Sequence, residues 1–237
     1  IDGIDWNFFH PKLAELDLLL PFLEEASKIW RDGSGLLFSF ALSPNQVLPS
    51  REYYDFIDRI NLMAYDMADG RNYHAGIGMV VKAVDVLIRS GCPRNKILVG
   101  IPGYGRDIRQ PGIVKTFAEI YDEKYNDYKG EGEVECDHDL RKQRWYTEHI
   151  SRNGDTGGKI AWDSPDRVER KVGYALKEGL GGVFFWELGH DKHHPSRGKG
   201  GILLQTAASA AGVAAATAVK NDVGGGDKEE YGMKDEL

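Results

Sequence analysis

The residues best suited to chemistry stand at the start of the chain. There, acidic and amide side chains interrupt an apolar and aromatic run, Ile1-Asp2-Gly3-Ile4-Asp5-Trp6-Asn7-Phe8-Phe9-His10-Pro11. Side chains alternate between faces along a β-strand, so Asp5, Asn7 and Phe9 share one face. Polar groups on the inward face of a buried strand are costly unless they bond each other or a ligand. The run therefore predicts a strand that carries a functional site.

The spacing of these residues resembles the fourth-strand signature of glycoside hydrolase family 18, the chitinases and their relatives. That signature is Asp-x-x-Asp-x-(Asp or Asn)-x-Glu, commonly followed by an aromatic residue and Pro. Asp2, Asp5, Asn7 and Pro11 match it, whereas Phe9 stands where the family has Glu.

The resemblance implies catalytic positions for Asp5, Asn7 and Phe9. The position of Asn7 holds the group that steadies the N-acetyl arm of the substrate as that arm attacks the anomeric carbon, in place of a protein nucleophile. The position of Phe9 holds the acid that protonates the leaving oxygen. Because Phe cannot donate a proton, we expect impaired cleavage. By analogy with the family, neither Asp5, Asp66 nor Glu187 is placed to replace the acid.

Three later segments resemble further strands of the same family. Residues 60–66, 97–106 and 181–188 are similar to its sixth, seventh and eighth strands, so the resemblance covers about residues 1–205. It implies that Met63, Tyr65 and Asp66 line the subsite next to the cleavage point. A phenol and a carboxylate suit that place because they orient an amide arm and stabilise its developing positive charge. A capped strand end with a core tyrosine is the structural alternative.

The resemblance also implies further substrate-binding residues. Trp186 would form a floor on which a sugar ring stacks, and a plain core tryptophan is the alternative. Tyr104 and Arg106 would shape the cleft wall and hydrogen-bond sugar hydroxyls. For Arg106 a structural salt bridge is an equal alternative.

The elements that must position these residues alternate between strands and helices, which predicts parallel βα units. We expect strands at the opening run and at residues 35–43, 60–65, 97–101 and 182–186. We expect helices from Pro21 to about Gly33, from 79 to 90 and from 164 to 178, and an apolar helix from Ile202. The predicted fold is α/β, a partial (β/α)8 barrel with strands four to eight and a small insertion between the seventh and eighth strands.

The expected domain organisation has two parts. Residues 1–205 form an N-terminally incomplete family 18 domain with an insertion at 107–163, and residues 206–237 form an Ala-rich helix extension and a flexible tail. Five strands leave a barrel with open edges, so we expect a fragment of a longer product or a degraded gene copy, and a non-folding remnant is a further possibility.

Composition restricts the function classes. The 237 residues carry a net charge of −7, and nothing forms a basic stripe with interleaved aromatics, which argues against a nucleic-acid partner. No apolar run approaches the length of a membrane span. No cofactor or metal is expected, and the histidine-containing run 189–194 is interpreted as a solvated loop.

The last four residues, Lys234, Asp235, Glu236 and Leu237, form a retrieval signal for the endoplasmic reticulum. We therefore expect a secretory-pathway location and the receptor for this signal as a partner; a charged tail that ends this way by accident is the alternative. Whether Cys92 and Cys136 pair is left open.

The expected ligand is chitin or a β-1,4-linked N-acetylglucosamine oligosaccharide. The candidate functions are a chitinase-like hydrolase, a lectin-like binder that has lost cleavage, and an endo-β-N-acetylglucosaminidase-like protein acting on N-glycan cores.

Overall fold

The fold is known from a computed structural model of the 237-residue chain. It describes residues 2–7, 13–31, 35–67, 75–107, 112, 114–128, 160–193 and 201–223. Within these ranges, side chains are described except at residues 13–17, 31, 107, 123–128 and 213–223.

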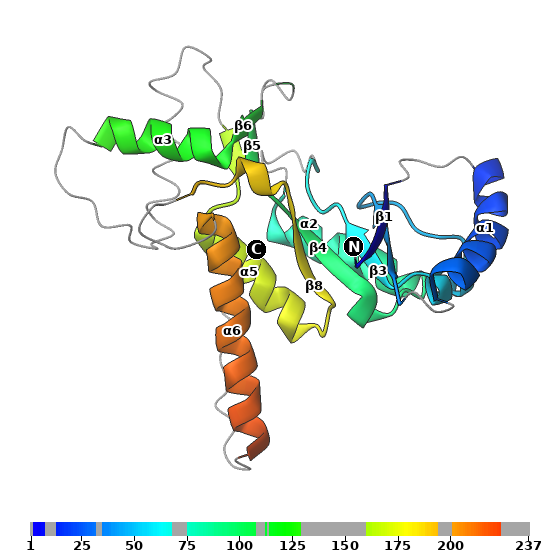
Figure 1. Ribbon diagram of the computed structural model, residues 1–237. Helices are drawn as coiled ribbons and strands as arrows, with labels where there is room; N and C mark the ends of the chain where they lie inside the picture. The colour runs from blue at the N-terminus through cyan, green and yellow to red at the C-terminus, as the bar shows by residue number, and fades with distance from the viewer. Residues whose placement is uncertain are drawn as a thin grey trace.

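Five parallel strands form the main sheet. They are β1 (Gly3–Asn7), β2 (Leu37–Leu42), β3 (Arg59–Leu62), β4 (Ile97–Pro102) and β8 (Gly182–Trp186), in the order β1-β2-β3-β4-β8. Each strand pairs in parallel with the next, and β1 and β8 lie at the two edges (Figure 1). The five predicted strands are confirmed, in the order expected for consecutive βα units.

Helices cover one face of this sheet. They are α1 (Leu13–Arg31), α2 (Ile77–Arg89) and α5 (Pro165–Lys177), with the 3₁₀ turns η1 (Arg51–Phe56) and η2 (Arg94–Lys96) between strands. Alternate strand residues such as Phe38, Phe40 and Leu62 point toward the helices and form a buried core with Leu23 of α1 and Val84 of α2. The opposite face of the strands therefore carries the residues that do not belong to this core.

The predicted start of the first helix at Pro21 is wrong. Pro21 lies inside α1, which begins at Leu13. Leu19, Leu23 and Ala26 are buried at helical spacing on both sides of the proline, so one apolar stripe runs through it. Packing of that stripe outweighs the cost of a proline within a helix, since tertiary contacts routinely override local propensity.

A small second sheet follows β4. It contains β5 (Tyr104–Asp107), β6 (Val114–Thr116) and β7 (Ile160–Trp162) in antiparallel order β6-β5-β7, with α3 (Phe117–Tyr128) beside it. The similarity of residues 97–106 to one strand therefore covers two strands, because the chain leaves the main sheet after Pro102. Tyr104 and Arg106 stand on β5 and belong to this small lobe.

A second buried core joins the lobe to the last two helices. Phe117 and Trp162 of the lobe, Val172 of α5 and Leu203 of α6 (Ile202–Val223) all belong to it. The helix predicted from 164 to 178 is confirmed as α5, and Ser164 caps it, since the Ser164 hydroxyl accepts a hydrogen bond from the Arg167 backbone N–H at 3.4 Å. Figure 1 shows α6 extending away from the body beyond α5.

One buried ion pair lies at this junction. Lys171 of α5 donates to a carboxylate oxygen of Asp163, and both side chains are 1% exposed. Burial lowers the pKa of Lys171, and the Asp163 charge opposes that change.

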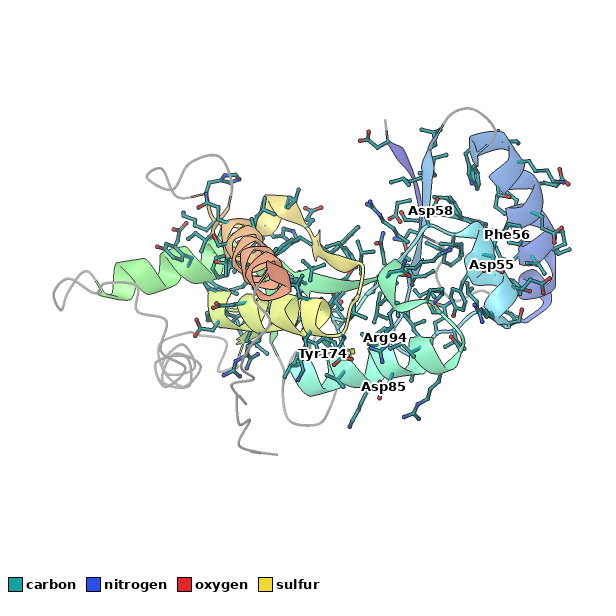
Figure 2. The ribbon with its side chains drawn as sticks, turned by 90° about the horizontal axis from the view of Figure 1, so that it is seen from below. Asp55, Phe56, Asp58, Asp85, Arg94 and Tyr174 are labelled. Carbon is teal, nitrogen blue, oxygen red and sulfur yellow. The ribbon has the colours of Figure 1, made fainter. Side chains whose placement is uncertain are left out.

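Polar side chains also gather at the solvent side of the helical layer, where Asp85 and Arg94 are exposed and Tyr174 is half-buried. Below the sheet, Asp85 of α2, Arg94 of η2 and Tyr174 of α5 gather in one region (Figure 2). Burial raises the pKa of Tyr174, to which the charges of Glu178 and Asp85 add. None of the described helices is long and apolar enough to cross a membrane.

Several predictions concern residues outside the described set. They are Phe9, Cys136, most of the insertion at 107–163, and the tail with Lys234, Asp235, Glu236 and Leu237. Cys92 is described; it is buried and carries a free thiol.

Candidate functional site

The inward face of β1 carries the first two candidate residues. Asp5 and Asn7 point away from the helical core, and both are exposed. The Asp5 Oδ1 atom accepts hydrogen bonds from the Ser39 hydroxyl at 2.6 Å and from the Asn61 amide at 2.8 Å. A polar row thus crosses β1, β2 and β3, as the cost of unpaired polar groups on a strand face requires.

The end of β3 supplies Met63, Tyr65 and Asp66. The side chains of Met63 and Tyr65 are buried, each with 9% of its surface exposed. Asp66 adopts a left-handed backbone conformation, with φ of 57°. Aspartate accepts that conformation more readily than most residues, so the chain can turn sharply at the strand end.

The small lobe supplies the wall opposite Asp66. Arg106 Nη2 donates a hydrogen bond to Asp66 Oδ2 at 2.6 Å, while Arg106 Nε donates to Asp66 Oδ1. The Arg106 Cζ atom also lies 5.7 Å from the centre of the Tyr104 ring, a cation–π distance. One guanidinium therefore holds a carboxylate of the main sheet and an aromatic ring of the lobe at once.

Burial and nearby charges raise the pKa values of the two phenol groups beside this ion pair. Burial, together with the charges of Asp66 and Asp5, raises the pKa of Tyr65. Burial and Asp66 likewise raise the pKa of Tyr104. The hydrogen bond to Asp66 raises the pKa of Arg106. At neutral pH both phenols are therefore protonated donors beside a guanidinium that stays charged.

Edge-on contacts between aromatic rings hold the side chains of Tyr65 and Tyr104 in place. The Tyr65 ring meets Tyr104 edge-on at 6.3 Å and Phe184 at 6.4 Å between ring centres. Gly100 on β4 makes room for this arrangement, because a Cβ there would lie 2.7 Å from Tyr65 Cε1 and 2.9 Å from Phe184 Cζ. The floor of the site is thus closely packed from β3 to β8.

Trp186 ends β8 at the same edge of the sheet, and 49% of its surface is exposed. It is not a core tryptophan. Together with Asn7, Met63, Tyr65, Asp66, Tyr104, Arg106 and His190, it lines one cleft of about 1180 Å³. A concave surface that combines aromatic side chains with a few convergent polar groups is a typical ligand site.

The residues after Trp186 tie the floor to other parts of the fold. The Trp186 carbonyl accepts a hydrogen bond from the Gly103 N–H at 2.9 Å. Asp191, which is buried, accepts hydrogen bonds from the N–H groups of Leu203 and Leu204 at 3.1 and 3.0 Å, which caps α6. Lys192 Nζ donates to Asp122 of α3 at 2.7 Å. Residues 186–192 therefore contact the sheet, the lobe and the last helix.

Most of the predicted site residues come together. The structure places Asn7, Met63, Tyr65, Asp66, Tyr104, Arg106 and Trp186 around the cleft. Asp5 lies beside it, close enough for its charge to act on Tyr65. The position of Phe9 lies outside the described residues.

Sequence reasoning missed Ser39, Asn61 and His190. Ser39 and Asn61 are polar residues within apolar strand runs, at positions that alternate onto the inward face, and that signal was available. His190 lines the cleft and lies 3.4 Å from the Glu187 carboxylate through Nε2. His190 was not predicted because it stands in the run 189–194, which was interpreted as a solvated loop.

The arrangement suits recognition of an uncharged, hydroxyl-rich ring. An exposed indole can stack on the apolar face of a pyranose, while the phenols, the guanidinium and the Asn7 amide can bond hydroxyl or amide groups. The carboxylates in and beside the cleft have partners: Asp66, which lines it, is bonded by Arg106, and Asp5, beside it, accepts hydrogen bonds from Ser39 and Asn61. Among the described residues, no group of three or more His, Cys, Asp or Glu side chains could hold a metal ion.

The chain belongs to the glycosyl hydrolases family 18, whose profile matches residues 1–191. A curated relative, Endochitinase 1 of Metarhizium robertsii, is 32% identical over 229 residues. That match includes 82% of this chain and 53% of the relative, so the chain spans about half the length of the curated protein.

Solved structures show the same fold. The GH18 chitinase ChiB of Flavobacterium johnsoniae has a TM-score of 0.64 and 23% identity, with coverage of 90% of this chain and 61% of that one. A plant class V chitinase mutant of Cycas revoluta in complex with (GlcNAc)3 has a TM-score of 0.62 and 19% identity, covering 90% and 67%. The main sheet with its helices is therefore part of a (β/α)8 barrel, and the open sheet corresponds to the predicted strands four to eight.

Proposed function

We propose that this protein is a chitinase-like binder of β-1,4-linked N-acetylglucosamine oligosaccharides. The observation that carries the proposal is the convergence of Tyr65, Asp66, Tyr104, Arg106 and Trp186 on one cleft. The names of the relatives support the same ligand class, since one is an endochitinase and one solved chitinase holds (GlcNAc)3. The indole floor would stack a sugar ring, and the polar wall would orient its N-acetyl arm.

Cleavage is impaired in this proposal because Phe9 replaces the general acid. In the substrate-assisted retaining route, the N-acetyl oxygen attacks the anomeric carbon while an acid protonates the departing glycosidic oxygen. Phenylalanine has no proton to give. Asp66 is paired with the Arg106 guanidinium, and Glu187 is not among the described residues that line the cleft. Neither is a free acid aimed at a leaving group.

Hydrolysis and binding should be measured side by side. The 237-residue chain is incubated with a fluorogenic chito-oligosaccharide, and its retention on chitin beads is measured in parallel. We expect retention without cleavage, and we expect Phe9→Glu to gain cleavage. Cleavage by the unchanged chain would show that its acid lies elsewhere, and absence of retention would overturn the binding proposal.

A second candidate is an endo-β-N-acetylglucosaminidase-like protein that acts on the chitobiose core of N-glycans. It is favoured by the C-terminal sequence Lys234-Asp235-Glu236-Leu237, which would place the protein in the lumen where such glycans occur. Release of a labelled N-glycan under conditions in which chito-oligosaccharides stay intact would favour this candidate.

We also propose a location in the endoplasmic reticulum and retrieval by the receptor for that signal. The support is the sequence of the last four residues. When the protein is expressed with a secretory leader, deletion of residues 234–237 should move it from the cells into the medium. Equal retention of both forms would argue against retrieval.

A further inference from the structure

The main sheet has an open side at β1. In the described part of the chain, β1 has one neighbouring strand, β2. The Asp2 carbonyl accepts a hydrogen bond from the Leu37 N–H at 2.9 Å, so the backbone groups of even-numbered residues point toward β2. Those of Gly3, Asp5 and Asn7 therefore point to the open side, where they can pair with a further strand. Figure 1 shows β1 at this end of the sheet.

A continuous apolar surface adjoins the open side. On α1, Leu18 and Ile29 are 72% and 78% exposed, and Phe22, which is also exposed, lies on the same helical face. The ring centres of Phe22 and Trp6 are 4.8 Å apart, so this face adjoins β1. Ile4 is exposed on the same side of β1 as Trp6. We call Ile4, Leu18, Phe22 and Ile29 the edge surface; exposed apolar patches of this kind mark interaction sites.

A second copy of the chain fits the open side through a two-fold axis beside Ile4. The two β1 strands would run antiparallel, as identical edges do across such an axis. Gly3 of each copy would exchange two backbone hydrogen bonds with Asp5 of the other, and Ile4 would face Ile4. In this register no two carboxylates lie opposite each other, whereas an axis beside Asp5 would place two of them face to face.

The same axis brings the two α1 helices to packing distance. α1 lies above both β1 and β2, because Phe22 contacts Trp6 and Trp30 stacks on Phe38 at 4.5 Å between ring centres. The α1 helices of two copies are then about two strand spacings apart, roughly 9.5 Å. That separation falls within the range of packed helices.

The contacts between the two helices follow from the position of the axis. α1 runs opposite to β1, so the step from Trp6 back to Ile4 corresponds to roughly four residues forward from Phe22 along α1. The axis therefore lies midway between Phe22 and Ile29. Phe22 of one copy consequently meets Ile29 of the other, and both are removed from water.

The charges on this face also suit a copy of itself. Between Phe22 and Ile29, α1 carries Glu25 and Lys28, which form an exposed ion pair at 2.6 Å. Opposite charges would alternate around the axis, so no net charge opposes association. We propose that the edge surface binds a second copy of this chain, which gives a dimer with one continuous sheet of five strands from each copy.

Sedimentation equilibrium of the 237-residue chain tests the inference. We expect a concentration-dependent mass that approaches about twice 26.4 kDa. Ile4→Lys would place two ammonium groups beside the axis, so the dissociation constant should rise at least about a hundredfold. Ile29→Glu, at the most exposed position of the edge surface, should raise it at least about tenfold. Leu176→Lys changes an exposed leucine on α5 and should leave it unchanged.

A cross-link tests the register separately. In a Cys136→Ser background, Ile4→Cys should form a covalent dimer under mild oxidation, because Cβ atoms facing each other in an antiparallel pair are about 5 Å apart, close to the span of a disulfide. Leu176→Cys should not. A monomer at every concentration would overturn the inference. So would a dimer whose dissociation constant is the same in Ile4→Lys, Ile29→Glu and the unchanged chain.

Discussion

Arg106 of the small lobe and Asp66 of the main sheet form a two-point ion pair across the cleft, with Nη2 2.6 Å from Oδ2. Asp66, whose φ is 57°, follows β3 of the main sheet, and Arg106 lies on β5 of the small antiparallel sheet. The ion pair therefore joins the two sheets. Its partners are 30% and 37% exposed, so solvent screens it in part. Its main effect is therefore geometric, because it fixes both groups relative to Tyr104.

Replacement of Arg106 by lysine should test this role. Lysine keeps the positive charge but cannot form the planar two-point contact. We expect the affinity for chitotriose to fall about tenfold while the unfolding free energy changes by less than about 1 kcal/mol. Titration calorimetry and urea unfolding give the two quantities. Arg94→Lys, at the exposed pair with Glu178, is the control and should leave the affinity unchanged.

Replacement of Trp186 by alanine should separate binding from stability. Because half of this side chain is exposed, we expect the unfolding free energy to change by less than about 1 kcal/mol. Loss of the stacking surface should weaken chitotriose binding about tenfold or more. A large loss of stability with unchanged chitotriose binding would contradict this prediction and show that Trp186 acts as a core residue.

The cap of α6 provides a stability test away from the cleft. A Cβ on Gly201 would lie 2.1 Å from Asp191 Oδ2, so Gly201→Ala must displace the capping carboxylate. We expect Gly201→Ala and Asp191→Ala each to cost about 1–2 kcal/mol. The double variant should cost less than their sum, since both remove the same contact. Gly212→Ala in the same helix has nothing within 4 Å of the added Cβ and should not destabilise.

The buried thiol of Cys92 predicts a pH dependence. Burial raises the pKa of Cys92 from 9.0 to about 12, and Lys96 opposes the shift. The unfolded thiol ionises first, so the unfolded state is favoured as pH rises through this window. The contribution of Cys92 to stability is thus intact below pH 9 and is lost progressively between pH 9 and about 12.

Two measurements check this prediction in a Cys136→Ser background, which leaves one thiol. At pH 8 a thiol reagent should react with Cys92 in urea and not in the folded protein. In addition, Cys92→Ala should reduce the loss of stability between pH 9 and pH 10. Rapid reaction of the folded protein would show that the thiol is accessible.

The strands were the part of the fold most open to prediction. Val99 and Phe40 stand in short apolar runs bounded by turn residues, and such runs predict buried parallel strands. The start of α1 was not open to prediction, because Pro21 is a strong local signal and the packing that overrides it is a tertiary effect. The change of sheet after Pro102 was hidden for a similar reason, since β5 follows β4 without a long connection.

The site also has features that local motifs predict and features that depend on tertiary structure. Tyr65, Asp66 and Trp186 stand in recognisable motifs at strand ends, so their types and spacing were sufficient to place them together. The ion pair of Asp66 with Arg106 depends on how the lobe folds back over the sheet. That tertiary arrangement is not encoded in a local run of residues.

Residues 186–192 connect the cleft to the start of the last helix, α6. The backbone of Trp186 bonds Gly103, Asp191 caps α6, and Lys192 reaches α3. We therefore expect a ligand that steadies Trp186 to steady the cap of α6 as well, and a change that loosens the start of α6 to weaken ligand binding in the cleft. The docking of a helix that does not line the cleft would then contribute to the affinity of the cleft for its ligand.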